Sequence, residues 1–275
     1  MMRLFRVHLA VLILFTVHFS LHSQTADTGS GPFSQHALSS SKQIDHTLFK
    51  IFLAKYVNTN HPSGINLVRY SQVSTQDRQL LKNYIKQLES VTISKYQREE
   101  QLPFWINLYN AVIIDTVLDH YPVKSVEEIN LGEDIYSWGP WDAGLITIEG
   151  VTLSLNDIRH SILISVWKDP RIHYALCNGS VSAPDLHAEP FTRGNTQDLL
   201  NTLARNYINH IRGSEFVDGR LTLSSMYSWY MNDFGGTELR IKEHLMRYVS
   251  PTYKDKIKNY TGSIAYRYDW NLNGD

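Results

Sequence analysis

The sequence predicts a single α+β domain that contains more helix than strand. Several segments carry apolar residues at spacings of three and four, which is the pattern of amphipathic helices, and only short stretches are rich in β-branched residues. The region 40–275 contains no internal repeat and no linker. The hydrophobic content of the chain, 43%, is sufficient for one large core. We therefore expect one helix-rich domain with a small β-sheet.

The helices of the first half are predicted from apolar spacing and from the residues that interrupt it. Pro103 is expected to bend the third helix, because proline removes a backbone donor, and Pro122 ends that helix. Ser125 and Glu128 have the spacing of a capping box for a short helix. A loop is expected over 58–64, and helices are expected over 40–55, 75–90 and 95–120.

The second half is predicted to alternate short strands and helices. The β-branched residues around Glu149-Gly150 indicate a hairpin over 145–153, and Ser154 with Asp157 opens a helix. Asp169-Pro170 breaks this helix near residue 167. Further strands are expected over 171–177 and 220–223, and further helices over 196–211, 225–232 and 237–249.

The N-terminal residues predict export from the cell. Arg3 and Arg6 precede the apolar run 7–21, and small polar residues follow, which is the pattern of a secretory signal peptide. The run is shorter than the roughly 20 apolar residues of a membrane-spanning helix, so an uncleaved anchor is the weaker alternative. We expect a periplasmic or extracellular protein made of a signal peptide over 1–26, a disordered lead over 27–39 and a globular domain over 40–275.

Charge and cysteine content exclude several classes of partner and cofactor. Removal of residues 1–26 takes away two of the 26 basic residues and none of the 27 acidic ones, which leaves a net charge of about −3. This balance argues against nucleic acid as a partner, and no stable membrane insertion is expected after cleavage. The lone Cys177 allows no internal disulfide and excludes multi-cysteine zinc sites. No metal or other cofactor is expected.

The common catalytic motifs are absent from the sequence. The chain contains no HExxH, no P-loop and no GxGxxG after a strand. Gly179-Ser180 does not continue into a GxSxG elbow, because Ser182 stands where the second glycine is required. His187 and Glu189 have the spacing of a deaminase motif, but the cysteines of that motif are missing.

Two asparagines in the apolar helix predicted over 95–120 are the first candidate site residues. Asn107 and Asn110 are three positions apart, so they share one face of the helix. A buried asparagine needs partners for both ends of its amide. Either the two side chains hold the backbone of a loop, or they bind a ligand or orient a catalytic imidazole.

The segment 169–186 and the helix before it supply the other candidates. His173 is expected inside the predicted strand, and His160 on the preceding helix. Each histidine alone is typical of a hydrogen-bonded core residue, whereas a pair beside a loop of small residues indicates a general base. Arg171 is expected at the edge of this site, with a surface salt bridge as the alternative. We expect the histidines and the asparagines to form one polar patch beside the loop 178–184.

Five segments carry a family resemblance. They are FWINLYNAVI from Phe104, VTLSLNDIRHSIL from Val151, DPRIHYAL from Asp169, LSSMYSWYMNDFG from Leu223 and YDWNLN from Tyr268. With these segments the sequence resembles the domain of unknown function 547 family over nearly all of the chain after the signal peptide. The resemblance implies an architecture similar to that of papain and transglutaminases, and it says little about activity.

The loop after DPRIHYAL departs from the family pattern. The family motif there has the form N-C-x-x-x-x-C-P, whereas this chain has Cys177-Asn178 in place of the first pair and Ala183 before Pro184. If relatives use a thiolate paired with a histidine, the nucleophile is missing here. A shift by one residue also turns Cys177 to the opposite face of a strand, so Cys177 is not expected to substitute for the nucleophile. Because it lies in an apolar segment with no basic neighbour in sequence, we expect a buried, unreactive thiol.

Three functions follow as alternatives. The first is a cysteine-lacking relative of a thiol enzyme, a pseudoenzyme that keeps a pocket for a small molecule or a peptide. The second is an active hydrolase or transferase in which His160 or His173 is the base and water or Ser182 is the nucleophile. The third is a structural or interaction protein. In the first alternative, the old pocket is lined by Asn107, Asn110, His160 and His173. The residues expected to bind a ligand are Asn107, Asn110, Arg171 and Asn178.

Overall fold

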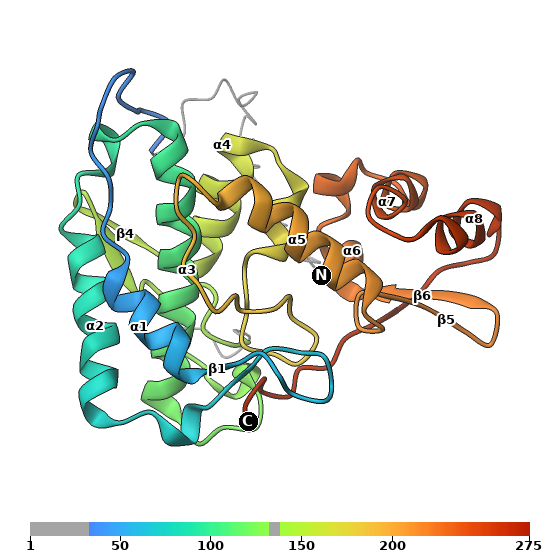
Figure 1. The fold of residues 1–275 in the computed structure, drawn as a ribbon, viewed down its shortest axis with the longest axis horizontal. Helices are drawn as coiled ribbons and strands as arrows, with labels where there is room; N and C mark the ends of the chain where they lie inside the picture. Colours follow the sequence, from blue (N-terminus) through green and yellow to red (C-terminus); the bar gives the residue numbers. More distant parts are fainter. Residues whose placement is uncertain (1–32, 132–137) are drawn as a thin grey trace, which may run out of the picture.

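The computed structural model describes residues 33–131 and 138–275. Three helices that pack side by side build the first half of the protein (Figure 1). Helix α3 lies at the centre, is buried along most of its length and continues through Pro103. The Ser74 hydroxyl caps α2, because its Oγ accepts the Asp77 N–H at 3.1 Å. The helices are α1 (Thr47–Tyr56), α2 (Thr75–Glu89) and α3 (Arg98–His120), with short 3-10 helices at Tyr70–Gln72, Ile93–Lys95 and Val126–Glu128.

The segment before α1 corrects the predicted disordered lead over residues 33–39. The Arg98 guanidinium at the start of α3 donates to the backbone carbonyls of Phe33, at 3.4 Å, and of Ser34. These contacts hold the segment against the domain. The helix expected from about residue 40 begins only at Thr47. The predicted signal peptide and the start of the lead lie outside the described residues.

A β-hairpin covers one side of α2, as predicted from the β-branched residues. Strand β3 (Ile146–Ile148) pairs antiparallel with β4 (Val151–Leu153). Glu149 and Gly150 form the turn with φ of 48° and 82°. Two successive positive φ values match the right-handed twist of a two-residue hairpin.

A wide helix follows the hairpin. Ser154 and Asp157 cap it reciprocally: Asp157 N–H donates to Ser154 Oγ at 3.0 Å, and Ser154 N–H donates to the Asp157 carboxylate at 2.9 Å. The helix is a π-helix over Asp157–Ile164 and continues as α4 (Ser165–Trp167) until Lys168. π-helical turns are rare in proteins, but those that do occur are often found at functional sites.

The strand predicted over 171–177 is wrong: this segment forms a 3-10 helix (Pro170–Tyr174) and a turn. The Asp169 carboxylate accepts the Arg171 N–H at 2.9 Å, and Pro170 has a backbone angle suited to the first helical position. Residues 172–177 are all buried. Because a short apolar run that is buried on every side has no distinguishing period, the sequence pattern could not separate strand from helix.

A three-stranded sheet and several short helices form the C-terminal part, at the right of Figure 1. Strand β6 (Arg220–Ser224), which the sequence predicted, pairs antiparallel with β5 (Ser214–Val217) and parallel with β7 (Ala265–Arg267). The Thr237 hydroxyl caps α7 as expected. The helix expected over 225–232 is divided in two at Tyr230. The helices are α5 (Thr196–Asn209), α6 (Ser225–Trp229), a 3-10 helix (Met231–Phe234), α7 (Glu238–Leu245) and α8 (Pro251–Asn259).

Residues 269–275, here called the tail, connect the two parts of the domain. Asn273 N–H donates to the Gly179 carbonyl, and the Asn273 carbonyl accepts from Val68 N–H, both at 2.9 Å. Val68 belongs to β2 (Leu67–Val68), which pairs with β1 (Val57–Asn58) after α1. The tail thus lies between this small ribbon and the loop that follows Cys177.

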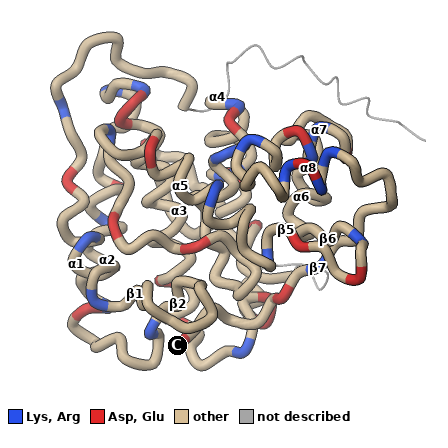
Figure 2. Tube along the Cα trace, turned by 45° about the vertical axis from the view of Figure 1, so that its right-hand side comes forward, with Lys and Arg blue, Asp and Glu red and all other residues tan. Residues whose placement is uncertain are grey.

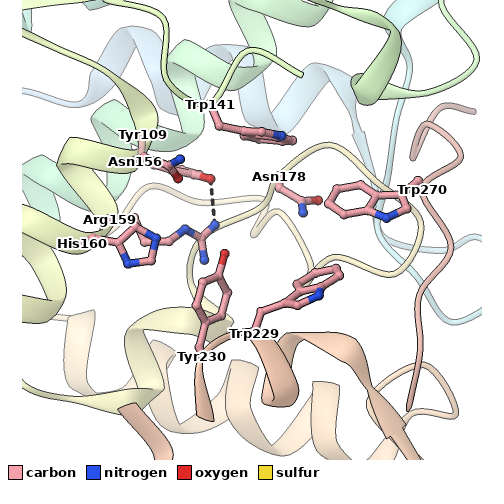
Figure 3. A pocket seen from close by; sticks show the side chains of 9 residues that line it. All are labelled: Tyr109, Trp141, Asn156, Arg159, His160, Asn178, Trp229, Tyr230 and Trp270. Atoms are coloured by element: carbon pink, nitrogen blue, oxygen red, sulfur yellow. Dashed lines mark hydrogen bonds between the residues drawn. The ribbon is translucent and has the colours of Figure 1, made fainter. Parts of the chain in front are cut away.

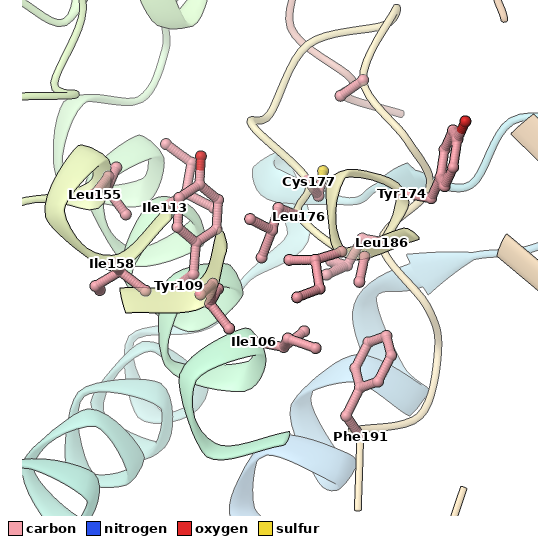
Figure 4. Packing of buried hydrophobic residues seen from close by; sticks show 14 of the residues in the cluster. Ile106, Tyr109, Ile113, Leu155, Ile158, Tyr174, Leu176, Cys177, Leu186 and Phe191 are labelled. Atoms are coloured by element: carbon pink, nitrogen blue, oxygen red, sulfur yellow. The ribbon is translucent and has the colours of Figure 1, made fainter. Parts of the chain in front are cut away.

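The core is continuous from α1 to α8, and Figure 4 shows the part around α3. In the view of Figure 2, lysines and arginines are interspersed with aspartates and glutamates along the trace. Within the described ranges, no helix has the length and apolar character needed to cross a membrane. The architecture is the helix-rich α+β class that the sequence predicted, with sheets of two and three strands.

Candidate functional site

A pocket of about 260 Å³ opens between α3, the π-helix, the end of α6 and the tail (Figure 3). Its wall consists of aromatic rings and of side chains with planar polar groups. Segments far apart in the sequence supply these side chains, so the pocket depends on the complete fold. The lining residues are Tyr109, Trp141, Asn156, Arg159, His160, Asn178, Trp229, Tyr230 and Trp270.

Arg159 supplies a buried positive charge to this pocket. Its side chain is 5% exposed, and one guanidinium nitrogen donates to the Tyr109 hydroxyl at 2.7 Å. The guanidinium lies 5.1 Å from the ring centroids of both Tyr109 and Tyr230, within the range of cation–π attraction. No carboxylate of the described residues lies within ion-pair distance of it. Arginine stays protonated in proteins, so a full charge faces the pocket without a counter-ion among these residues.

His173 lies behind Arg159 and separates it from a carboxylate. The His173 ring is completely buried, stacks on Tyr230 at 4.4 Å, and places Nε2 2.9 Å from the Asp233 carboxylate. Its Nδ1 is 3.4 Å from an Arg159 nitrogen. Because arginine only donates, Nδ1 is the acceptor there, and Nε2–H donates to Asp233. Burial lowers the pKa of His173 to about 4, against the opposing effect of Asp233, so the ring is neutral.

His160 is the histidine that faces the pocket. Its ring contacts Tyr230, with centroids 5.5 Å apart, and its side chain is exposed. Burial of part of the ring and the adjacent Arg159 charge lower its pKa. At neutral pH the ring is therefore uncharged, and Arg159 is the source of positive charge among the lining residues.

The opposite wall of the pocket is a stack of aromatic rings. Trp229 and Trp270 stack at 5.3 Å with an interplanar angle of 25°, and Trp141 lies 6.2 Å from Trp270. Tyr268 packs 4.6 Å from both Trp229 and Trp270. In Figure 3 the three indoles lie across the central space from Arg159.

The two predicted asparagines do not line the pocket. Asn107 donates to the Phe191 carbonyl at 2.7 Å and accepts the Phe191 N–H at 2.9 Å. Asn110 donates to the Ala175 carbonyl at 2.9 Å and accepts the Cys177 N–H at 3.0 Å. Both amides thus hold loop backbone against α3. This is the first of the two alternatives, in which the asparagines bond to the backbone of a loop and not to a ligand. The expected single polar patch does not form, because backbone groups satisfy the asparagines separately from the histidines.

The other predicted residues are divided between three places. Asn178 lines the pocket and donates to the Tyr268 hydroxyl at 2.8 Å. Arg171 is outside it and pairs with Asp169 at 2.6 Å, as in the salt-bridge alternative. Ser182 lines a different cavity of about 330 Å³, where its hydroxyl accepts the Asp269 N–H at 2.8 Å. The structure therefore does not bring Ser182 next to either histidine.

Cys177 is buried, with 2% of its surface exposed. Burial raises the pKa of its thiol to about 11, so little thiolate forms near neutral pH. We expect native protein to react with dithionitrobenzoate at least about 100-fold more slowly than urea-unfolded protein at pH 8. Absorbance of the released thiolate measures both rates. Stoichiometric labelling of the native protein within seconds would contradict a buried thiol.

Most residues of the pocket were not predicted, although the sequence contained a signal for them. Arg159, Trp229, Tyr230 and Trp270 all lie inside the segments that carried the family resemblance. Those segments were informative about kinship, but a sequence pattern does not show which side chains of distant segments meet. The convergence of these segments on one pocket is the new information in the structure.

The structure is that of a helix-rich α+β protein with a pocket lined by a buried arginine and by aromatic rings. Residues 93–208 match the family described as Protein of unknown function, DUF547. The segments from Leu223 and Tyr268 lie outside the match. No curated protein and no solved structure matches the chain, so the similarity to papain and transglutaminases remains a prediction. Over the described ranges, no cluster of three or more His, Cys, Asp or Glu could hold a metal ion.

Proposed function

We propose that the pocket binds a small molecule with one carboxylate group and that the protein acts by binding this ligand. The observation that carries the proposal is the Arg159 guanidinium, which is buried at the pocket without a carboxylate partner among the described residues. A buried charge is costly unless it is paired. A ligand carboxylate would supply the missing partner through two parallel N–H···O bonds, for which the guanidinium is well suited.

The charge of the pocket favours a carboxylate over a phosphate. Arg159 contributes one positive charge, and the lowered pKa of His160 leaves that ring neutral near pH 7. A phosphate monoester carries about −1.5 to −2 at this pH, so one guanidinium would leave part of its charge unbalanced. A single carboxylate matches the single cation.

Binding is favoured over hydrolysis because the parts of a catalytic pair are not assembled. The His173–Asp233 pair has the geometry of a base and its orienting carboxylate, but His173 is covered by Tyr230 and faces Arg159. Neither Ser182 nor Cys177 lines the pocket. The proposal therefore corresponds to a relative of a thiol enzyme that keeps a pocket and lacks the nucleophile. We also propose, from the N-terminal residues alone, that the protein is exported and meets its ligand outside the cytoplasm.

The test compares carboxylates with their amides. Glucuronate, benzoate and lactate would each be titrated against glucuronamide, benzamide and lactamide, with calorimetry as the measurement. We expect at least one acid to bind and its amide to bind about 10- to 100-fold more weakly, since a hydrogen-bonded charge is worth about 1.5–3 kcal/mol.

Arg159→Met should remove this preference for the acid. The substitution also leaves the Tyr109 hydroxyl and His173 Nδ1 without the guanidinium that bonds to them, so near-ultraviolet circular dichroism is used to show that the variant is folded. Arg171→Met is the matched control: it deletes an arginine that does not line the pocket, and binding should persist. If no acid of the panel binds in an Arg159-dependent manner, or if the amides bind equally well, the proposal is wrong.

A further inference from the structure

We infer that the ligand of this pocket is a sugar acid, that is, a single pyranose ring with a carboxylate. This inference rests on the proposed function. It adds the chemistry of the rest of the ligand, the ring that bears the carboxylate. Three independent features of the pocket support it: the exposed indole faces, the hydrogen-bonding groups that face the same space, and the volume.

The indoles provide flat apolar surface that the protein itself does not cover. Trp229 is 46% exposed, and Trp141 and Trp270 are half-buried, although all three line the pocket. Burial of large aromatic side chains is strongly favourable. A ligand that covers these faces removes their apolar surface from water, which favours binding. A pyranose has C–H bonds on its flat faces that pack against an electron-rich indole, while its hydroxyls project at the edge.

Polar groups across the pocket from the indoles are available to those hydroxyls. In the described part of the chain, no hydrogen bond is formed by the Tyr230 hydroxyl or by the His160 ring nitrogens, and both residues face the pocket. Figure 3 shows the Tyr230 hydroxyl pointing into the space beside Arg159. The Asn178 amide adds a planar group fixed by Tyr268. An aromatic acid could stack on the indoles, but it would leave these groups without partners other than water.

The volume limits the ligand to one ring. At about 260 Å³, the pocket is below the roughly 300–1,000 Å³ of sites that enclose drug-sized molecules. A fatty acid is disfavoured, because the lining alternates aromatic and polar side chains and offers no long aliphatic channel. A nucleotide is disfavoured by its larger size and by its phosphate charge.

The experiment is calorimetric titration of the protein with glucuronate, galacturonate and N-acetylneuraminate, with benzoate and glucose as comparisons. We expect at least one sugar acid to bind about tenfold or more tightly than both benzoate and glucose. Benzoate has the carboxylate and a flat ring without hydroxyls, and glucose has the hydroxylated ring without the charge. The comparison therefore separates the two parts of the ligand.

Two tryptophan variants test the stacking wall. Trp229→Ala should weaken binding of that sugar acid by about tenfold, and Trp229→Phe, which keeps a smaller flat ring, should have an intermediate effect. Trp138→Ala is the matched control, because Trp138 is 73% exposed and does not line the pocket; its binding should equal that of the unmodified protein. Near-ultraviolet circular dichroism shows whether each variant is folded.

The outcomes distinguish this inference from the proposed function. If benzoate binds as tightly as every sugar acid and Arg159→Met abolishes its binding, the sugar inference is wrong and the carboxylate proposal stands. If glucose binds as tightly as the sugar acids, the carboxylate proposal is wrong, and the inference fails with it. Sugar-acid binding that is unchanged in both Trp229→Ala and Trp229→Phe would overturn the placement of the ring on the indoles.

Discussion

Replacing Asn110 with alanine is expected to lower the free energy of unfolding by about 2–5 kcal/mol, because it leaves two buried backbone groups without partners. The Ala175 carbonyl loses a donor and the Cys177 N–H loses an acceptor. Each buried group left unsatisfied costs about 1–3 kcal/mol. Asn107→Ala should have a similar effect through Phe191, whose N–H and carbonyl both bond to the Asn107 amide.

Urea unfolding monitored by circular dichroism measures these changes. Asn83→Ala is the matched control, since Asn83 is an asparagine on the exposed face of α2, and surface substitutions usually change stability by less than about 0.5 kcal/mol. If Asn110→Ala kept full stability but lost ligand binding, the amide would belong to the binding site and not to the loop.

The protein is expected to lose much of its stability between pH 6.5 and 4. Burial lowers the pKa of His46, His173 and His244 to about 4 each, from 6.5. Above pH 6.5 these rings are neutral in both states, so the folded state keeps its full stability. Below pH 6.5 the unfolded chain binds protons that the folded protein does not bind until about pH 4. Stability therefore falls with pH, by up to about 1.4 kcal/mol per pH unit for each histidine.

The combined effect is large compared with the total stability of a typical domain, about 5–15 kcal/mol. Urea unfolding at pH 7, 6, 5 and 4.5 measures the dependence. His244→Gln should reduce the slope by about one proton, because glutamine can bond to the Tyr174 hydroxyl, now 2.9 Å from His244 Nε2, without titrating. His61→Gln, in the exposed loop before Gly64, is the control. Equal stability at pH 7 and 4.5 would show that the buried rings accept protons without cost.

The parts of the fold that the sequence predicted are those with local causes. Helix α2 matched its amphipathic spacing and the hairpin its turn residues, and Ser154, Asp157 and Thr237 cap as expected. The prediction of a strand over 171–177 was wrong because the segment is buried on every side. It therefore has no alternation of polar and apolar residues that could distinguish a strand from a helix. Strands β5 and β7 were not predicted because they are short and form only by pairing with β6. In addition, β7 is distant from β6 in the sequence.

The candidate site was predicted only in part, for a related reason. Asn107 and Asn110 were correctly identified as unusual buried amides, but the sequence could not show that the backbone near Phe191 and Cys177 satisfies them. His160 and Asn178 do line the pocket. Arg159 was overlooked beside His160, because an arginine on a helix is usually solvated and its burial depends on neighbours from other segments.

The position of the tail affects the order in which the protein can assemble during translation. Residues 93–208, the segment shared with the family, leave the ribosome before Trp270 and Asn273 have been made. Until then, the Gly179 carbonyl lacks the Asn273 N–H, and the pocket lacks one of its indoles. A nascent chain that lacks the tail therefore has no complete pocket. The family segment is best regarded as a scaffold that later residues close, and a fragment limited to it would be a poor substitute for the whole protein.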